Sequence, residues 1–251
     1  MRLTADLLGS GSTIPLRDAA GDICGSLWCH AATWACRDAP LEFRLIGPEP
    51  LVVPEPESSE PVVGALARLL QAIKGSGALL LLGNPAAALG AERILYADGV
   101  RLFSIVRPED ESCWDALLAY GQPVYGVRGI VSLEASTAHP AGVMSALAYG
   151  LFTCDEGLSL TGLHEDRAGV AYACDHATTA TVLIRHGFEA AELHGAADQQ
   201  VRWLDRGNEA VVRLVITDAE GHRCSTQPRF VVPQRGAEAK AETGAAKPTH
   251  E

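Results

Sequence analysis

The sequence predicts an α/β domain followed by a small antiparallel β-sandwich. Segments with strand and helix patterns alternate up to about residue 150, which is typical of an α/β architecture. Residues 151–232 instead form a series of short strand-like segments with polar or Gly-rich turns and no helical period. We therefore expect an α/β domain over residues 1–153 and a β domain over residues 154–233. Residues 234–251 carry almost no large apolar side chain, so this tail is expected to be disordered.

Strand, helix and strand patterns follow one another in the first 53 residues. Residues 2–8, RLTADLL, have the pattern of a strand that ends in a loop of glycine and serine. Residues 23–36, ICGSLWCHAATWAC, have the pattern of a hydrophobic helix with its thiols on the buried face. Residues 43–53 contain two short strand-like pieces that are separated by a proline turn.

From residue 62 onward, helices and strands alternate. Val62, Leu66 and Leu69 recur at helical spacing, and Gly75 ends this helix. ALLLL, residues 78–82, is a continuous apolar run with the length of a strand buried on both faces of a parallel sheet. The remaining helices are expected at residues 108–121 and 139–150, and the remaining strands of this half at residues 123–127 and 129–135. Between them and the apolar run, residues 94–106 carry a tight-turn signal at Asp98-Gly99.

Charge and composition narrow the function classes. The chain of 251 residues has a formal net charge of −11 and no basic run, which argues against a nucleic-acid surface. Its longest apolar runs are shorter than the roughly 20 residues that span a bilayer. The N-terminal segment MRLTADLL lacks the apolar stretch of a secretory signal. We therefore expect a cytoplasmic protein that binds neither nucleic acid nor a membrane.

The seven cysteines predict free thiols rather than a metal centre. Their number is odd and no C-x-x-C occurs, as expected for buried thiols in a reducing compartment. Cys24, Cys29 and Cys36 form one local cluster with His30, but their spacing fits no common zinc module. No metal and no other cofactor is therefore expected.

Three segments resemble a known superfamily. They are CWDALLAYGQPVYGV, MSALAYGLFTCDEGLSLTGL and RLVITDAEGHRCSTQPRFVV. Their order along the chain resembles the PHP superfamily, the polymerase and histidinol phosphatase-type metallohydrolases, in the branch with a C-terminal β domain. The resemblance implies a PHP-like distorted (β/α) barrel and an ancestry in metal-dependent hydrolysis.

The metal-ligand positions of that superfamily are replaced in this chain. The family's first strand ends in D-L-H-x-H, whose two histidines lie on one side of the strand and hold a metal. Here the strand ends in DLLGS, with Leu8 and Ser10 at the histidine positions. Asn84 stands where the family has the histidine of a His-Pro pair, and the family's D-x-H has no counterpart at Arg128. Leucine cannot ligate a metal and a serine hydroxyl replaces imidazole poorly, so the resemblance implies loss of the catalytic metals.

These losses favour a catalytically inactive PHP-like protein that acts as a non-catalytic subunit or protein-binding module. Its partner would be another protein or a second copy of the chain. No catalytic or metal-ligating residue is expected. A remnant pocket would be lined by Asp6, Ser10, Asn84 and Arg128.

Two alternatives stay open. A metal-dependent hydrolase of the phosphoesterase or amidohydrolase type would need a rearranged metal site. A small-anion binder would use the Gly9–Thr13 loop, whose small residues leave backbone N–H groups free to face an anion. Arg128 would add a positive charge to that anion site. Metal content and phosphate binding distinguish these alternatives from a protein-binding module.

Overall fold

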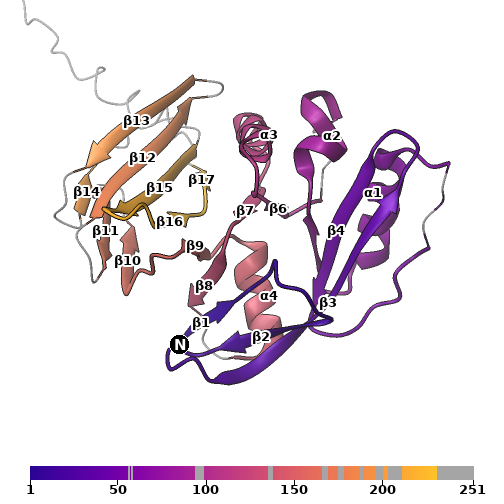
Figure 1. The fold of residues 1–251 in the computed structure, drawn as a ribbon, viewed down its shortest axis with the longest axis horizontal. Coiled ribbons are helices and arrows are strands. Elements are labelled where there is room, and N and C mark those ends of the chain that lie inside the picture. Colours follow the sequence, from indigo (N-terminus) through magenta and orange to yellow (C-terminus); the bar gives the residue numbers. More distant parts are fainter. Residues whose placement is uncertain are drawn as a thin grey trace, which may run out of the picture.

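A computed structural model describes most of the chain up to residue 230. The described residues are 1–55, 57, 59–93, 99–134, 138–165, 169–174, 178–186, 189–195, 200–202 and 211–230. They form four helices, one sheet of 14 strands and a second sheet of three strands (Figure 1). The expected disordered tail, residues 234–251, lies outside the described residues. None of the helices in the described ranges is long and apolar enough to cross a membrane.

The N-terminal part is an antiparallel meander that continues into a short parallel segment. Successive neighbours in the sheet are β1 (Arg2–Ala5), β2 (Thr13–Arg17), β3 (Ile23–Ala35), β4 (Pro40–Gly47), β5 (Leu79–Leu82), β6 (Leu102–Ser104) and β7 (Tyr125–Val127). Pairing is antiparallel from β1 to β5 and parallel only between β5, β6 and β7. The expectation of a buried strand at residues 78–82 is thus confirmed, with a parallel partner on one side only.

The expected helix at residues 23–36 is wrong, because this segment is strand β3. Its side chains alternate between the two faces of the sheet, as in any strand. Leu27 and Cys29 are buried in one core, whereas Trp28 and Trp34 pack in the other. Since both faces of β3 meet apolar surroundings, its apolar residues do not show strict alternation, and the pattern resembles that of a buried helix.

Helices cover the two faces of this sheet unequally. One face carries the three helices α1 (Val62–Ile73), α2 (Pro85–Arg93) and α3 (Pro108–Ala119), whose apolar side chains pack with Leu80, Leu82 and Phe103. The opposite face carries α4 (Pro140–Ala148), which packs with Leu81, Leu102 and the side chains of β1 and β2. Alternate residues of β5 therefore lie in different cores.

The second half of the chain extends the same sheet. The strands that continue it are β8 (Ile130–Glu134), β9 (Phe152–Glu156), β12 (Thr178–His186), β13 (Glu189–Gly195), β15 (Val211–Asp218), β16 (Arg223–Thr226) and β17 (Arg229–Phe230). The three-stranded sheet consists of β10 (Gly162–Glu165), β11 (Gly169–Ala173) and β14 (Gln200–Arg202). A third core joins Leu158, Leu160 and Tyr172 to Leu214 and Ile216 of β15.

The expected fold class, a PHP-like α/β barrel, is wrong. The described part of the chain is mostly a large mixed sheet with only four helices. The connections at residues 6–12, 18–22 and 36–39 are too short for the crossovers of about a dozen residues that parallel strands require. β1 to β4 therefore pair as hairpins. β9 pairs with β8 on one side and with β16 on the other, so the sheet runs across the expected domain boundary at residues 153–154.

Candidate functional site

Three of the four expected site residues, Asp6, Asn84 and Arg128, form hydrogen bonds or ion pairs within the protein. The exposed Asp6 accepts a hydrogen bond from Leu8 N (3.0 Å) and so supports its own loop, on which Ser10 is also exposed. Asn84 is buried, and its side chain accepts from Glu42 N and donates to Pro40 O, both at 3.1 Å. Asn84 thus fixes the beginning of β4 to the end of β5.

Arg128 belongs to an ion-pair network between α3 and β15. Its guanidinium lies 2.6 Å from the carboxylate of Glu111, which also receives Arg213 at 2.8 Å. Arg213 is buried, and its guanidinium lies 4.7 Å from the centre of the Trp114 ring. Burial alone would raise the pKa of Glu111, but hydrogen bonds and charges from Arg213 and Arg128 outweigh it and lower the pKa.

A pocket of about 530 Å³ lies near the carboxyl ends of β5 and β6, where ligands of α/β sheets commonly bind. None of the four expected site residues (Asp6, Ser10, Asn84 and Arg128) lines this pocket. Two residues close to them in the sequence, Leu8 and Gly83, do line it. Its Arg44 donates to the carbonyls of Leu8 (2.8 Å) and Gly9 (2.6 Å). Its Asp110 accepts from the backbone N–H groups of Ala86 and Arg107, both at 3.2 Å. These two charges are therefore already engaged within the protein.

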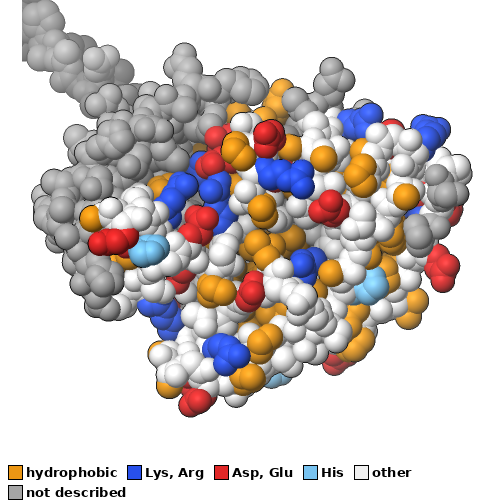
Figure 2. Space-filling model, in the orientation of Figure 1, with side chains coloured by type: hydrophobic (Ala, Val, Ile, Leu, Met, Phe, Trp, Pro, Cys, Tyr) orange, Lys and Arg blue, Asp and Glu red, His pale blue; other side chains and the backbone are white. Residues whose placement is uncertain are grey.

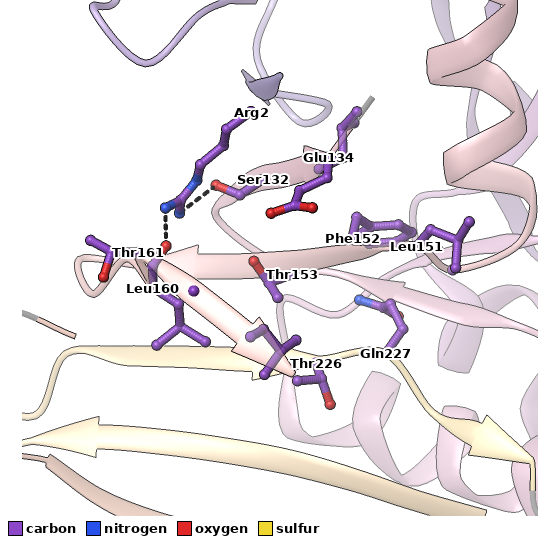
Figure 3. Close-up of a pocket in the computed structure, with 14 residues that line it drawn as sticks. Arg2, Ser132, Glu134, Leu151, Phe152, Thr153, Leu160, Thr161, Thr226 and Gln227 are labelled. Atoms are coloured by element: carbon purple, nitrogen blue, oxygen red, sulfur yellow. Dashed lines mark hydrogen bonds between the residues drawn. The ribbon is translucent and has the colours of Figure 1, made fainter. Parts of the chain in front are cut away.

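A second, open pocket of about 250 Å³ lies beside β8, β9 and β10 (Figure 3). We call it the β-pocket. Its polar lining residues are Arg2, Ser132, Glu134, Thr153, Thr161, Thr226 and Gln227. Leu151 and Leu163 are among its apolar lining residues and are 64% and 38% exposed.

Three hydroxyl residues of the β-pocket stand in one row across the sheet. Ser132 of β8 pairs with Thr153 of β9, and Thr153 pairs with Thr226 of β16. Directly paired residues point to the same face, so the three side chains come together although they are far apart in the sequence. The register of the strands thus brings the Ser132 and Thr153 hydroxyls together at the floor of the pocket, whereas Thr226 Oγ1 accepts from Leu214 N at 3.0 Å.

A buried carboxylate holds this floor in place. Asp155 accepts hydrogen bonds from Ser132 Oγ (2.6 Å) and Thr153 Oγ1 (3.2 Å), and Ser159 Oγ donates at 2.5 Å. Arg2 lies 3.6 Å from the same carboxylate and also donates to the carbonyl of Leu160. Because the Ser132 and Thr153 protons are directed to Asp155, both oxygens offer only lone pairs to the pocket.

Glu134 offers a further acceptor, whereas the free acceptor of Gln227 is enclosed by the protein. Gln227 is 7% exposed and its Nε2 donates to Gly126 O (2.9 Å), while its Oε1 has no hydrogen-bond partner within the described chain. The Glu134 carboxylate is exposed, and no ion pair joins it to another described residue. Figure 3 shows this carboxylate and the Thr153 hydroxyl directed into the same space.

One group of possible metal ligands occurs among the described residues. Asp218, Glu220 and His222 place one ligand atom each within 4.8 Å of one another on the hairpin between β15 and β16. His222 Nδ1 lies 2.8 Å from Asp218 Oδ2, and His222 N donates to Asp218 Oδ1 at 2.8 Å. These contacts close the hairpin.

The expected cluster of cysteines does not form one site. Cys24 and Cys29 both belong to β3, but Cys24 is exposed at its beginning whereas Cys29 is buried.

The surface shown in Figure 2 has no large patch of positive or of negative side chains alone. Lys and Arg side chains are interspersed with Asp and Glu side chains, and hydrophobic side chains reach the surface between them. A phosphate backbone binds to clustered cations, so this face does not have the charge pattern of a nucleic-acid interface.

Comparisons with protein-family models, curated proteins and solved structures found no match to this chain. The site is therefore argued from its own geometry. Sequence reasoning missed Ser132, Glu134, Thr153 and Gln227, because their proximity depends on strand register. The available signal was a hydroxyl at one position in each of three strand segments, IVSLE, FTCDE and RCST.

Proposed function

We propose that the protein is a non-catalytic binding module that contacts a partner protein through the β-pocket and its apolar rim. The rim consists of Leu151 and Leu163, which are 64% and 38% exposed. Both side chains line the pocket. The observation that carries the proposal is this group of exposed apolar side chains beside an open polar pocket.

The physical argument concerns what such a surface gains on binding. Each Å² of apolar surface that leaves water contributes about 25 cal/mol, so covering the rim favours association. Contiguous apolar patches bordered by polar groups commonly mark interaction sites. In the pocket at the ends of β5 and β6, by contrast, the charged side chains of Arg44 and Asp110 already form hydrogen bonds with the protein's own backbone.

The sequence supports the non-catalytic part of the proposal. The PHP resemblance is itself a proposal that rests on three sequence segments, and the sheet of this protein is not the barrel that the resemblance implies. Leu8, Ser10 and Asn84 occupy the positions of histidine ligands in that resemblance. The role of Asn84 in fixing β4 offers a structural reason for an amide at that position. We also place the protein in the cytoplasm, since its seven cysteines form no disulfide with one another.

The test is affinity capture from native extract with a matched pair of variants. The rim variant carries Leu151→Ser and Leu163→Ser. The control carries Val106→Ser, which changes a residue that is 70% exposed and lines the other pocket. We expect the wild type and the control to retain a protein partner or a second copy, and the rim variant to retain at least about tenfold less. Equal retention by all three, or a wild type that is only a lone monomer by light scattering, would contradict the proposal.

Metal analysis tests the alternative of a hydrolase with a rearranged site. Stoichiometric zinc, manganese or iron in the purified protein would favour the hydrolase and contradict the non-catalytic proposal. The anion-binding alternative has its own test. Phosphate that binds the native state must raise the melting temperature, so an unchanged melting temperature removes that alternative.

A further inference from the structure

We infer that the β-pocket accepts the ammonium group of a lysine side chain from the partner protein. The inference rests on the proposed function and deepens it, because it names the chemistry that the pocket recognises. Three independent features of the pocket carry it: its unused hydrogen-bond acceptors, its uncompensated charge and its apolar rim.

The hydrogen-bond inventory of the pocket leaves acceptors without donors. Thr153 directs its proton to Asp155, so its oxygen can only accept. The Glu134 carboxylate accepts from no described residue. A ligand that brings N–H donors satisfies these atoms, whereas an acceptor-only ligand such as a carboxylate does not.

The charge of the pocket favours a cation. Arg2 and Glu134 are its two charged lining residues, and they pair directly across β1 and β8. The Arg2 guanidinium nevertheless points to Asp155, Ser159 and the carbonyl of Leu160 (Figure 3 shows the last of these). The positive charge of Arg2 is therefore balanced by the negative charge of Asp155, and the carboxylate of Glu134 leaves the pocket with a net negative charge. The chain as a whole carries −11, which also attracts a basic partner.

Shape distinguishes lysine from other cations. A lysine carries its ammonium on a flexible stem of four methylenes, which packs along apolar surface such as Leu151 and Leu163. Its three N–H donors spread in different directions, and the acceptors of Glu134 and Thr153 come from β8 and β9. A guanidinium directs its donors in one plane and suits a single carboxylate better. A volume of about 250 Å³ suits one side chain rather than a large cofactor.

The test uses small probes and the full chain. Nα-acetyl-lysine N-methylamide is titrated into isotope-labelled protein, and the backbone amide resonances of residues 132–134, 151–153 and 226–227 are followed. The norleucine analogue has a similar apolar stem without the ammonium, and the arginine and glutamate analogues vary the charged group. We expect the lysine probe to shift these resonances and to bind at least about tenfold more tightly than each of the other three.

Two variants locate the binding charge. Glu134→Gln removes the unpaired carboxylate from an exposed position and is expected to weaken lysine binding about tenfold. The control Glu49→Gln changes an exposed acid outside the pocket and is expected to leave it unchanged. Equal binding of norleucine, tighter binding of arginine or glutamate, or an unaffected Glu134→Gln protein would overturn the inference.

The two proposals fail separately. If the rim variant loses its partner while the lysine probe does not bind, the lysine inference is wrong and the binding module stands. If the rim variant keeps its partner, the proposed function is wrong whatever the probe does.

Discussion

Glu111 of α3 and Arg213 of β15 form a 2.8 Å ion pair between the helical part of the molecule and the C-terminal strands. Arg213 is buried against Trp114, and Arg128 holds the second carboxylate oxygen of Glu111 at 2.6 Å. One carboxylate thus joins α3, β15 and the connection between β7 and β8. Arg128, which sequence reasoning assigned to a remnant ligand pocket, makes this structural contact.

We expect Glu111→Gln to lower the free energy of unfolding. The substitution removes a negative charge that faces two guanidinium groups, and hydrogen bonds to charged groups contribute about 1.5–3 kcal/mol each. Glu111 is partly exposed, so we expect a total loss of about 2 kcal/mol. Urea unfolding at pH 7 measures it. Glu109→Gln, an exposed acid in the same first turn, is the control and is expected to change the free energy by less than about 0.5 kcal/mol.

The same pair predicts a pH dependence. The folded-state pKa of Glu111 is lowered from its ordinary value of 4.5, so its contribution is fully present above about pH 4.5. That contribution is lost as the pH falls through the folded-state pKa. The difference in unfolding free energy between wild type and Glu111→Gln should therefore shrink on acidification from pH 7 to below 4.5. A difference that stays constant over this range would show that the charge of Glu111 does not stabilise the fold.

Gly150 is expected to tolerate no side chain. It follows α4 with φ of +67°, and a Cβ there would overlap with the ring of Tyr125. We expect Gly150→Ala to lower the free energy of unfolding by about 2–4 kcal/mol, because backbone strain and overpacking add. Gly121→Ala is the matched control, since its φ is +74° and nothing lies within 4 Å of a new Cβ. Similar losses of unfolding free energy in the two variants would show that the contact with Tyr125 does not contribute to the destabilisation.

The cysteines are expected to differ sharply in reactivity. Burial raises the pKa of Cys113 and of Cys154 to about 12, so neither is a thiolate near neutral pH. Cys24 is exposed. Brief alkylation of the native protein at pH 7.5 should modify Cys24 and spare Cys113 and Cys154, as read by mass spectrometry of peptides. Equal modification of all three without denaturant would contradict the described packing.

The local elements were predictable where one periodicity dominates. The helices expected at residues 108–121 and 139–150 are confirmed as α3 and α4, because each has a proline start and a glycine after its end. The segment 23–36 was not predictable, since β3 lies between two cores and its apolar residues fall on both faces. The barrel expectation failed because the resemblance covered the later chain, while short hairpin connections decide the topology of the first 47 residues.

The candidate site was predictable only in part. The segment TADLLGSGSTIP indicated a loop without metal ligands, and the structure places Asp6 and Ser10 there as exposed side chains. The β-pocket needs the register that aligns Ser132, Thr153 and Thr226 across three strands. Shifting any strand by one residue would turn its hydroxyl to the other face, and the sequence alone does not specify that register.

Hydrogen–deuterium exchange of the full chain, with and without the captured partner, tests directly whether the β-pocket and its rim are the contact surface. We expect slower exchange on binding at residues 150–153, 160–163 and 226–227, which form the rim and the β-pocket. Unchanged exchange at these residues, with protection confined to the pocket near the ends of β5 and β6 or to another surface, would contradict it.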